Sequence, residues 1–126
     1  MIQQRTILRV YDNSGAKTVK CIKVLGGFKK KYAKLGDTII VSVQQLRNRS
    51  KKTSKVKKKE IYKALIIKTK AKNRKKDGLQ TCLINNGVVL INKQGSPVST
   101  RIVSPIPKAL KQKKLKKFIS ISLGLT

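Results

Sequence analysis

Positively charged side chains are the groups in this chain best placed to do chemistry, and they occur in short clusters along its whole length. The sequence contains 32 Lys and Arg residues against 4 Asp and Glu, a formal net charge of +28 on 126 residues. Ammonium and guanidinium groups bind phosphate, and an arginine can hold one phosphate through two parallel hydrogen bonds. A folded domain with so little internal countercharge repels itself unless a polyanion neutralises it. The composition therefore predicts a nucleic-acid partner.

Other kinds of chemistry have few residues to carry them. The chain has no His, so Ser–His and Cys–His catalysis lack their base. The four acids fall at predicted turns or strand edges: Asp12, Asp37, Glu60 and Asp77. With 3 Tyr, 2 Phe and no Trp, the chain also lacks the aromatic array on which single-strand binders stack bases. We expect no catalytic residues, no cofactor and no metal site, and we expect binding through phosphate contact and shape.

The two cysteines, Cys21 and Cys82, each lie inside an apolar run without a neighbouring His or a second Cys. A zinc site requires closely spaced ligand pairs, and a disulfide requires an oxidising compartment. We expect both cysteines to be buried, reduced thiols, with a disulfide as the alternative.

Apolar, β-prone segments separate the basic clusters and predict the strands that position them. The segments with a strand pattern are 6–11, 18–25, 38–43, 61–69, 81–84 and 88–91. Asp12-Asn13-Ser14-Gly15 predicts a tight turn after the first of them, and Asn85-Asn86-Gly87 predicts a hairpin between the last two. Residues 47–59 are polar apart from Val56, which is typical of a loop or a projecting hairpin. Short strands at this spacing predict a mainly β fold, a small barrel, in one domain.

After Pro105 the sequence changes character, so we divide the single domain into a barrel with basic loops at 1–104 and a C-terminal helical segment at 105–126. Residues 108–119 carry helix formers, with Leu115, Phe118 and Ile119 at helical spacing. We expect one or two short helices packing on the barrel. Lysines surround so much of the short apolar face that docking or RNA contact is favoured over a membrane surface. No apolar run reaches the roughly 20 residues of a membrane span, so we expect no membrane insertion.

Seven strings along the chain resemble, in collinear order, the large-subunit ribosomal protein L-fourteen family of the bacterial and organellar type. They are MIQ at 1–3, DNSGAK at 12–17, CIKVLGG at 21–27, YAKLGD at 32–37, KALIIKTK at 63–70, KDG at 76–78 and VLINKQGSPVSTRI at 89–102. The resemblance covers essentially the whole chain and implies a closed five-stranded β-barrel, a projecting β-ribbon and short C-terminal helices. The family's basic loop corresponds to residues 46–60, a few residues longer here, and we expect the ribbon at this loop.

The resemblance also implies a function. Such a protein is a structural constituent of the large ribosomal subunit that binds large-subunit ribosomal RNA, lies beside ribosomal proteins of the L-nineteen and L-three families, and contributes to bridges with small-subunit ribosomal RNA at the inter-subunit face. A ribosome silencing factor is implied at Thr100, Arg101 and Lys117, which match the family's contact positions. The predicted RNA-binding residues are Lys17, Lys20, Lys23, Lys29, Lys30, Lys31, Arg47, Arg49, Lys51, Lys52, Lys55, Lys57, Lys58, Arg74, Lys75 and Lys76.

Composition also bears on the compartment and on the alternatives. Lysine far outnumbers arginine, and Ile and Asn are abundant, a bias expected from an A/T-rich genome. The first residues move straight into a strand pattern without a signal or transit segment. We expect a mitochondrial large-subunit protein encoded in the organelle, with a plastid or the bacterial cytoplasm as alternatives. A free-standing RNA chaperone on an OB-like barrel is the main rival function, and an enzyme relying on one of the lysines is the third.

Overall fold

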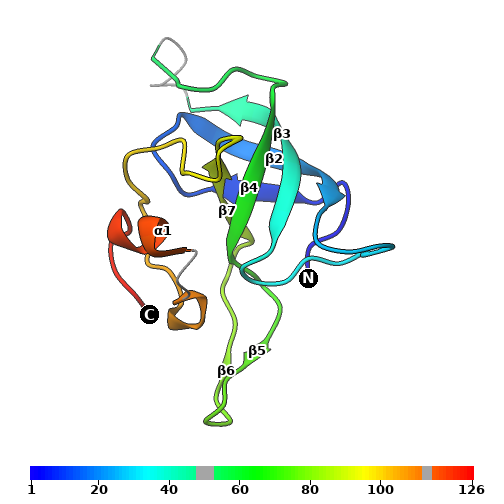
Figure 1. Ribbon diagram of the computed structural model, residues 1–126, viewed down its shortest axis with the longest axis vertical. Helices are drawn as coiled ribbons and strands as arrows, with labels where there is room; N and C mark the ends of the chain where they lie inside the picture. Colours follow the sequence, from blue (N-terminus) through cyan, green and yellow to red (C-terminus); the bar gives the residue numbers. More distant parts are fainter. Residues whose placement is uncertain (48–52, 112–114) are drawn as a thin grey trace.

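Five strands close into a small barrel at the centre of the molecule (Figure 1). The computed structural model describes residues 1–47, 53–111 and 115–126. The barrel strands, hydrogen-bonded in this order, are β1 (Ile7–Val10), β2 (Ala16–Val24), β3 (Thr38–Leu46), β4 (Ile61–Lys68) and β7 (Gly87–Ile91). Neighbouring strands are antiparallel except β1 and β7, whose parallel pairing closes the barrel. The expected mainly β fold with a closed five-stranded barrel is confirmed.

Alternating side chains fill this barrel. On β3, Ile39, Val41 and Val43 are fully buried, whereas the residues between them are partly exposed. Successive side chains of a strand point to opposite faces, so this pattern gives β3 one face toward the core. The strand β7 and residues 64–67 of β4 are buried on both faces because the C-terminal segment covers their outer side. The side chains on this outer side form a second hydrophobic cluster, apart from the core inside the barrel. It consists of Leu65, Ile67, Val89, Ile91, Ile102, Ile106, Leu110 and Phe118.

In the described part of the C-terminal segment, two short helical pieces lie beside the barrel in Figure 1. The 3₁₀ helix η2 spans Lys108–Leu110 and the α-helix α1 spans Lys116–Ser120, and each buries one apolar residue, Leu110 and Phe118. The Ile102 N–H donates to the Ile121 carbonyl at 2.9 Å, which ties the end of α1 to the chain that leaves the barrel. The expected short helices are confirmed. Within the described ranges, no helix is long and apolar enough to cross a membrane.

A two-stranded ribbon projects from the barrel between β4 and β7 (Figure 1). It pairs β5 (Asn73–Arg74) with β6 (Gln80–Thr81) in antiparallel register. The hairpin predicted between 81–84 and 88–91 is therefore wrong. The residues of β7 are apolar on both faces, so β7 takes a central place between β4 and β1, and β6 pairs with β5 instead.

Residues 47–59 were expected to form a loop or a projecting hairpin, and the ribbon implied by the resemblance was placed at 46–60. Residues 53–60 form turns without a ribbon strand, as expected for a loop, and residues 48–52 lie outside the described residues. Residues 53–60 fold back onto the barrel, where Val56 is fully buried in the main core. Two backbone hydrogen bonds fasten this segment, from the Lys55 N–H to the Ser14 carbonyl at 3.0 Å and from the Lys59 N–H to the Val43 carbonyl at 2.8 Å. The one apolar side chain of this polar stretch and these two hydrogen bonds anchor the segment to the barrel.

Candidate nucleic-acid interface

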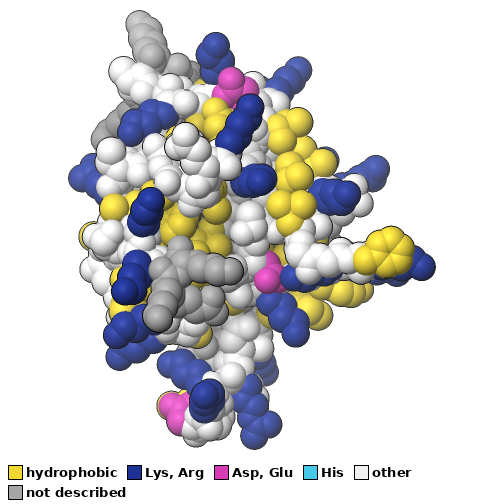
Figure 2. Space-filling model, viewed as in Figure 1, with side chains coloured by type: hydrophobic (Ala, Val, Ile, Leu, Met, Phe, Trp, Pro, Cys, Tyr) yellow, Lys and Arg dark blue, Asp and Glu magenta, His cyan; other side chains and the backbone are white. Residues whose placement is uncertain are grey.

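Basic side chains are spread over the visible face of the molecule, between apolar and uncharged surface, with few acidic ones among them (Figure 2). The candidate phosphate-binding residues that the structure describes come from four places and from Arg47 at the end of β3. The four places are the outer face of β2, the loop 25–37 between β2 and β3, the turn 53–60 before β4, and the ribbon. Each place fixes its cations in a different way.

On β2, irregular pairing brings three lysines to the outside. In a regular strand Lys20 would face opposite to Lys17 and Lys23, since side chains alternate. Register shifts in the pairing of β2 with β3 occur between Ala16 and Thr18 and between Cys21 and Lys23. Such bulges insert an extra residue and re-aim the side chains that follow. The inward positions become Ala16, Val19, Cys21 and Val24, and the three lysines remain accessible to solvent.

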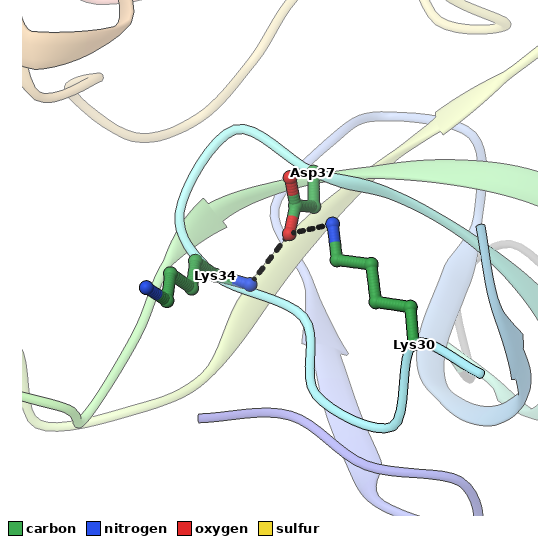
Figure 3. A network of polar contacts seen from close by, with 3 residues as sticks. All are labelled: Lys30, Lys34 and Asp37. Atoms are coloured by element: carbon green, nitrogen blue, oxygen red, sulfur yellow. Dashed lines mark hydrogen bonds and ion pairs between the residues drawn. The ribbon is translucent and has the colours of Figure 1, made fainter. Parts of the chain in front are cut away.

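In the loop 25–37, one carboxylate holds the basic cluster in place (Figure 3). Asp37 Oδ2 accepts a hydrogen bond from the Lys34 backbone N–H at 2.8 Å and from the Lys30 ammonium, also at 2.8 Å. Lys30, predicted as an RNA contact, is therefore engaged within the loop, whereas Lys29 and Lys31 on either side of it are exposed. The ion pair fixes the direction in which those two neighbours project.

The carboxylate of Glu60 likewise holds the turn 53–60 in place. It accepts the Lys57 backbone N–H at 2.9 Å and the Tyr62 hydroxyl at 2.7 Å. The hydrogen bond from the Lys57 backbone, followed by that from Tyr62, lowers the pKa of Glu60 below its ordinary value. Burial, and then the bond to Glu60, raises the pKa of Tyr62 to about 12. Lys55, Lys57 and Lys58 stand exposed around this turn.

At the tip of the ribbon, Arg74, Lys75 and Lys76 are exposed. The Lys75 N–H donates to the Leu79 carbonyl at 2.8 Å, and the Asp77 carboxylate accepts the Leu79 N–H at 3.3 Å. Gly78 takes a left-handed conformation, with φ +83°, that allows the tight turn. The ribbon therefore carries three cations away from the barrel on a hydrogen-bonded tip.

Arg47 differs from the other candidates, because its guanidinium is half-buried and donates to the Val10 carbonyl at 3.1 Å. Part of its hydrogen-bonding capacity thus ties β1 to the end of β3. The remaining predicted contacts Arg49, Lys51 and Lys52 lie outside the described residues.

The three residues predicted to face a protein partner lie on adjoining segments. Thr100 and Arg101 are exposed in a turn that Asn13 holds from the β1–β2 hairpin. The Asn13 amide donates to Thr100 Oγ1 at 2.8 Å, and its Oδ1 accepts the N–H groups of Thr100 at 3.1 Å and Arg101 at 3.4 Å. Lys117 is exposed on α1, whose C-terminal end is hydrogen-bonded to Ile102. The fold therefore joins the segment that carries Thr100 and Arg101 to the end of the helix that carries Lys117.

The expectation of two buried thiols is half wrong. Both cysteines are free; Cys21 points into the barrel, and burial raises its pKa. Cys82 is exposed, because it follows β6 on the ribbon and not a strand of the barrel. Within the described ranges, no group of three or more His, Cys, Asp or Glu residues is placed to hold a metal ion.

Sequence reasoning gave no role to Phe28 or to Asn13. Phe28 is 92 % exposed among the lysines of the loop 25–37. Its signal was available: a lone aromatic residue between Gly26-Gly27 and three lysines does not follow a strand pattern. Asn13 was assigned only to the turn after β1, since its bonds to Thr100 and Arg101 span most of the chain and leave no local sequence signature.

Comparison with known families adds one finding. The sequence model of the family described as ribosomal protein L14p/L23e matches residues 1–125 of this chain.

Proposed function

We propose, from the premise that the chain belongs to the ribosomal protein L14p/L23e family, that its basic loops bind large-subunit ribosomal RNA and that its C-terminal side contacts proteins and the subunit interface. Family membership makes the chain a non-enzymatic structural constituent of the large ribosomal subunit, with ribosomal RNA and ribosomal proteins as its partners. It also favours this role over the free-standing RNA chaperone.

The single observation that best supports the RNA-binding surface is that the four acidic side chains accept backbone hydrogen bonds and that three of them order the turns that carry the cations. Each of the four accepts a backbone N–H within the chain: Asp12 from Ser14 and Leu90, Asp37 from Lys34, Glu60 from Lys57 and Asp77 from Leu79. Three of these carboxylates lie in basic loops and order them. Phosphate groups that meet such loops find cations already held in position, which lowers the ordering entropy paid on binding.

We assign the protein-facing role to Thr100, Arg101 and Lys117. Their exposure and the anchoring of their turn by Asn13 support a surface that keeps its shape without RNA. The proposed partners there are a ribosome silencing factor and the small-subunit ribosomal RNA of an inter-subunit bridge, with proteins of the L-nineteen and L-three families as neighbours. A mitochondrial ribosome is the proposed location, with a plastid or the bacterial cytoplasm as alternatives. The bias toward Lys, Ile and Asn, together with the bacterial and organellar pattern of the motifs, supports it.

Charge reversal at Arg101 tests this division of surfaces. Arg101→Glu should leave incorporation into large subunits intact, because the lysine-rich loops are unchanged, and should impair subunit joining or silencing-factor binding. Sedimentation of subunits carrying the variant measures both steps. As a matched control, Arg74→Glu on the ribbon should reduce incorporation instead. If Arg101→Glu abolishes incorporation while joining and factor binding stay normal, the assignment is wrong.

A further inference from the structure

An exposed aromatic ring stands among the lysines of the loop 25–37. Phe28 is 92 % exposed, and the Lys29 ammonium lies 5.5 Å from the centre of its ring. Figure 1 shows this loop projecting from the barrel, and Figure 2 shows hydrophobic and basic side chains together at that projection. Single exposed apolar side chains are common on protein surfaces, but this ring is set apart by the cations around it and by the loop that carries it.

The loop that carries Phe28 is held at several points. The Leu25 N–H donates to the Thr38 carbonyl at 3.3 Å where the loop begins and ends. Ala33 pairs with Ile2 through two backbone hydrogen bonds of 3.0 and 2.8 Å, and the pair of Lys30 with Asp37 crosses the loop. The Lys30 ammonium passes over Gly26, where an added Cβ would lie 3.3 Å from it. Phe28 is thus presented on a preorganised loop.

Beside the ring lies an open hollow of about 980 Å³. Ile22, which is exposed, and the Phe28 ring supply apolar surface to it, and Arg5, Lys23 and Lys29 supply cations. Arg5 and Lys29 both have positive φ, 69° and 55°, a conformation that non-glycine residues seldom adopt. Strained backbone of this kind concentrates at binding sites, where the surrounding structure maintains it. Here both strained residues line the same hollow.

We propose that Phe28 stacks on an unpaired RNA base whose flanking phosphates are bound by Arg5, Lys23 and Lys29. The proposal rests on the proposed function and adds one specific contact to it. The described residues that line the hollow include no acid, so the ligand is an anion that also offers an apolar face. An unstacked nucleotide combines both in one residue, with a flat base for the ring and phosphates for the cations. A paired base is already stacked on its neighbours and offers the ring no face.

Tryptophan fluorescence tests the stacking directly, because the chain has no Trp of its own. The probes are a hairpin RNA with a single bulged adenosine and the same hairpin without the bulge, each titrated into the full-length chain. We expect the emission of Phe28→Trp to be quenched by the bulged RNA far more than by the paired one. The control Leu123→Trp, at a position 73 % exposed in the C-terminal segment, should show no such difference.

Affinities measured with the same two RNAs complete the test. Phe28→Ala should weaken binding of the bulged hairpin by about 5- to 150-fold, the range for losing one base–aromatic stack. Phe28→Leu should lose as much affinity for the bulged hairpin as Phe28→Ala. Phe28→Tyr should retain the wild-type preference for the bulged hairpin over the paired one. Lys29→Ala should weaken the binding of both RNAs by the same factor. It should also reduce the slope of log affinity against log salt concentration by about 1. Thermal unfolding of all variants should match the wild type, since the ring is outside the core.

The outcomes separate this proposal from the one on which it rests. If the wild type binds RNA with a salt-dependent affinity but Phe28→Ala binds the bulged hairpin equally well, the stacking contact is wrong and the RNA-binding function stands. If Phe28→Leu equals the wild type, the ring serves a general apolar contact, as with a protein partner, and stacking is again wrong. If the wild type binds neither RNA, both the proposed RNA-binding function and the stacking contact are wrong.

Discussion

Asp37 accepts two hydrogen bonds on one carboxylate oxygen, from the backbone of Lys34 and from the ammonium of Lys30. Glu60 likewise accepts from a backbone N–H and from a side chain, the Tyr62 hydroxyl. At the residue scale, the rare acids of this chain therefore do little to neutralise its charge. They set the conformation of the turns from which the neighbouring cations project.

The Glu60 carboxylate should stabilise its turn only while it is ionised. Its folded pKa lies below its unfolded value near 4.5, so its contribution is present above pH 4.5 and is lost as the pH falls through the folded pKa. Tyr62→Phe removes the second cause of the lowering, and the pKa of Glu60 should move back toward 4.5. NMR titration of the Glu60 side chain in both proteins measures this. Identical pKa values in wild type and variant would show that the Tyr62 hydroxyl has no part in it.

The two cysteines should differ sharply in reactivity. Cys21 is buried in the barrel with a raised pKa, so little of it is thiolate, whereas Cys82 is exposed on the ribbon. A maleimide pulse followed by mass spectrometry should label Cys82 rapidly and Cys21 only after unfolding. Cys82→Ser serves as the control and should leave the folded protein almost unlabelled. Equal labelling rates in the folded protein would place Cys21 outside the core.

At the scale of the elements, Val56 is the only buried apolar side chain among residues 53–60, the described segment before β4. Val56→Ala should destabilise the protein by about 2 kcal/mol, from two lost methyl groups and the cavity left behind. Val103→Ala is the matched control, since Val103 is 50 % exposed, and should change stability by less than about 0.5 kcal/mol. Urea unfolding measures both. Equal effects would mean that the segment 53–60 is not anchored through Val56.

The strands of the barrel were predictable because their apolar residues alternate or run continuously. Ile39, Val41 and Val43 on β3 mark an inward face without any knowledge of the partner strands. The partner of β7 was not predictable in this way. Its apolar residues fit a hairpin with 81–84 as well as a central place between β1 and β4, and only the closure of the barrel decides between them. This wrong pairing also led to the prediction of a buried Cys82, and it hid the ribbon that β5 and β6 form.

In the candidate interface too, local features were predictable and contacts that depend on the fold were not. Local sequence located the basic loops, since clusters of lysine beside turn residues are visible in any single stretch. It could not show that Arg47 reaches back to Val10, that Lys30 is engaged by Asp37, or that Asn13 holds Thr100. The contacts of Arg47 and Asn13 join residues far apart in the chain. The Lys30 pair is closer in sequence, but it depends on the folded path of the loop.

At the scale of the whole molecule, the net charge of +28 should make salt act in opposite directions on stability and on RNA binding. Raising NaCl from about 0.01 to about 1 M shortens the Debye length from about 30 to about 3 Å, which screens self-repulsion, so the midpoint of thermal unfolding of the isolated chain should rise. Affinity for RNA should fall instead, by about 10³- to 10⁵-fold between 50 and 200 mM salt if six to ten phosphates are bound. Calorimetry and filter binding measure the two effects. A midpoint that falls with added NaCl would contradict the self-repulsion account.

Because β1 pairs with β7 much further along the chain, the barrel cannot close until most of the chain has been synthesised. Val10 pairs with Val88, and at about 5–20 residues per second Val88 is added roughly 4–16 s after Val10. During that interval β1 can pair with β2, but its other edge offers unpaired N–H and C=O groups to any passing strand. A nascent chain that stops before Gly87 already carries most of its basic loops, yet it cannot close the barrel.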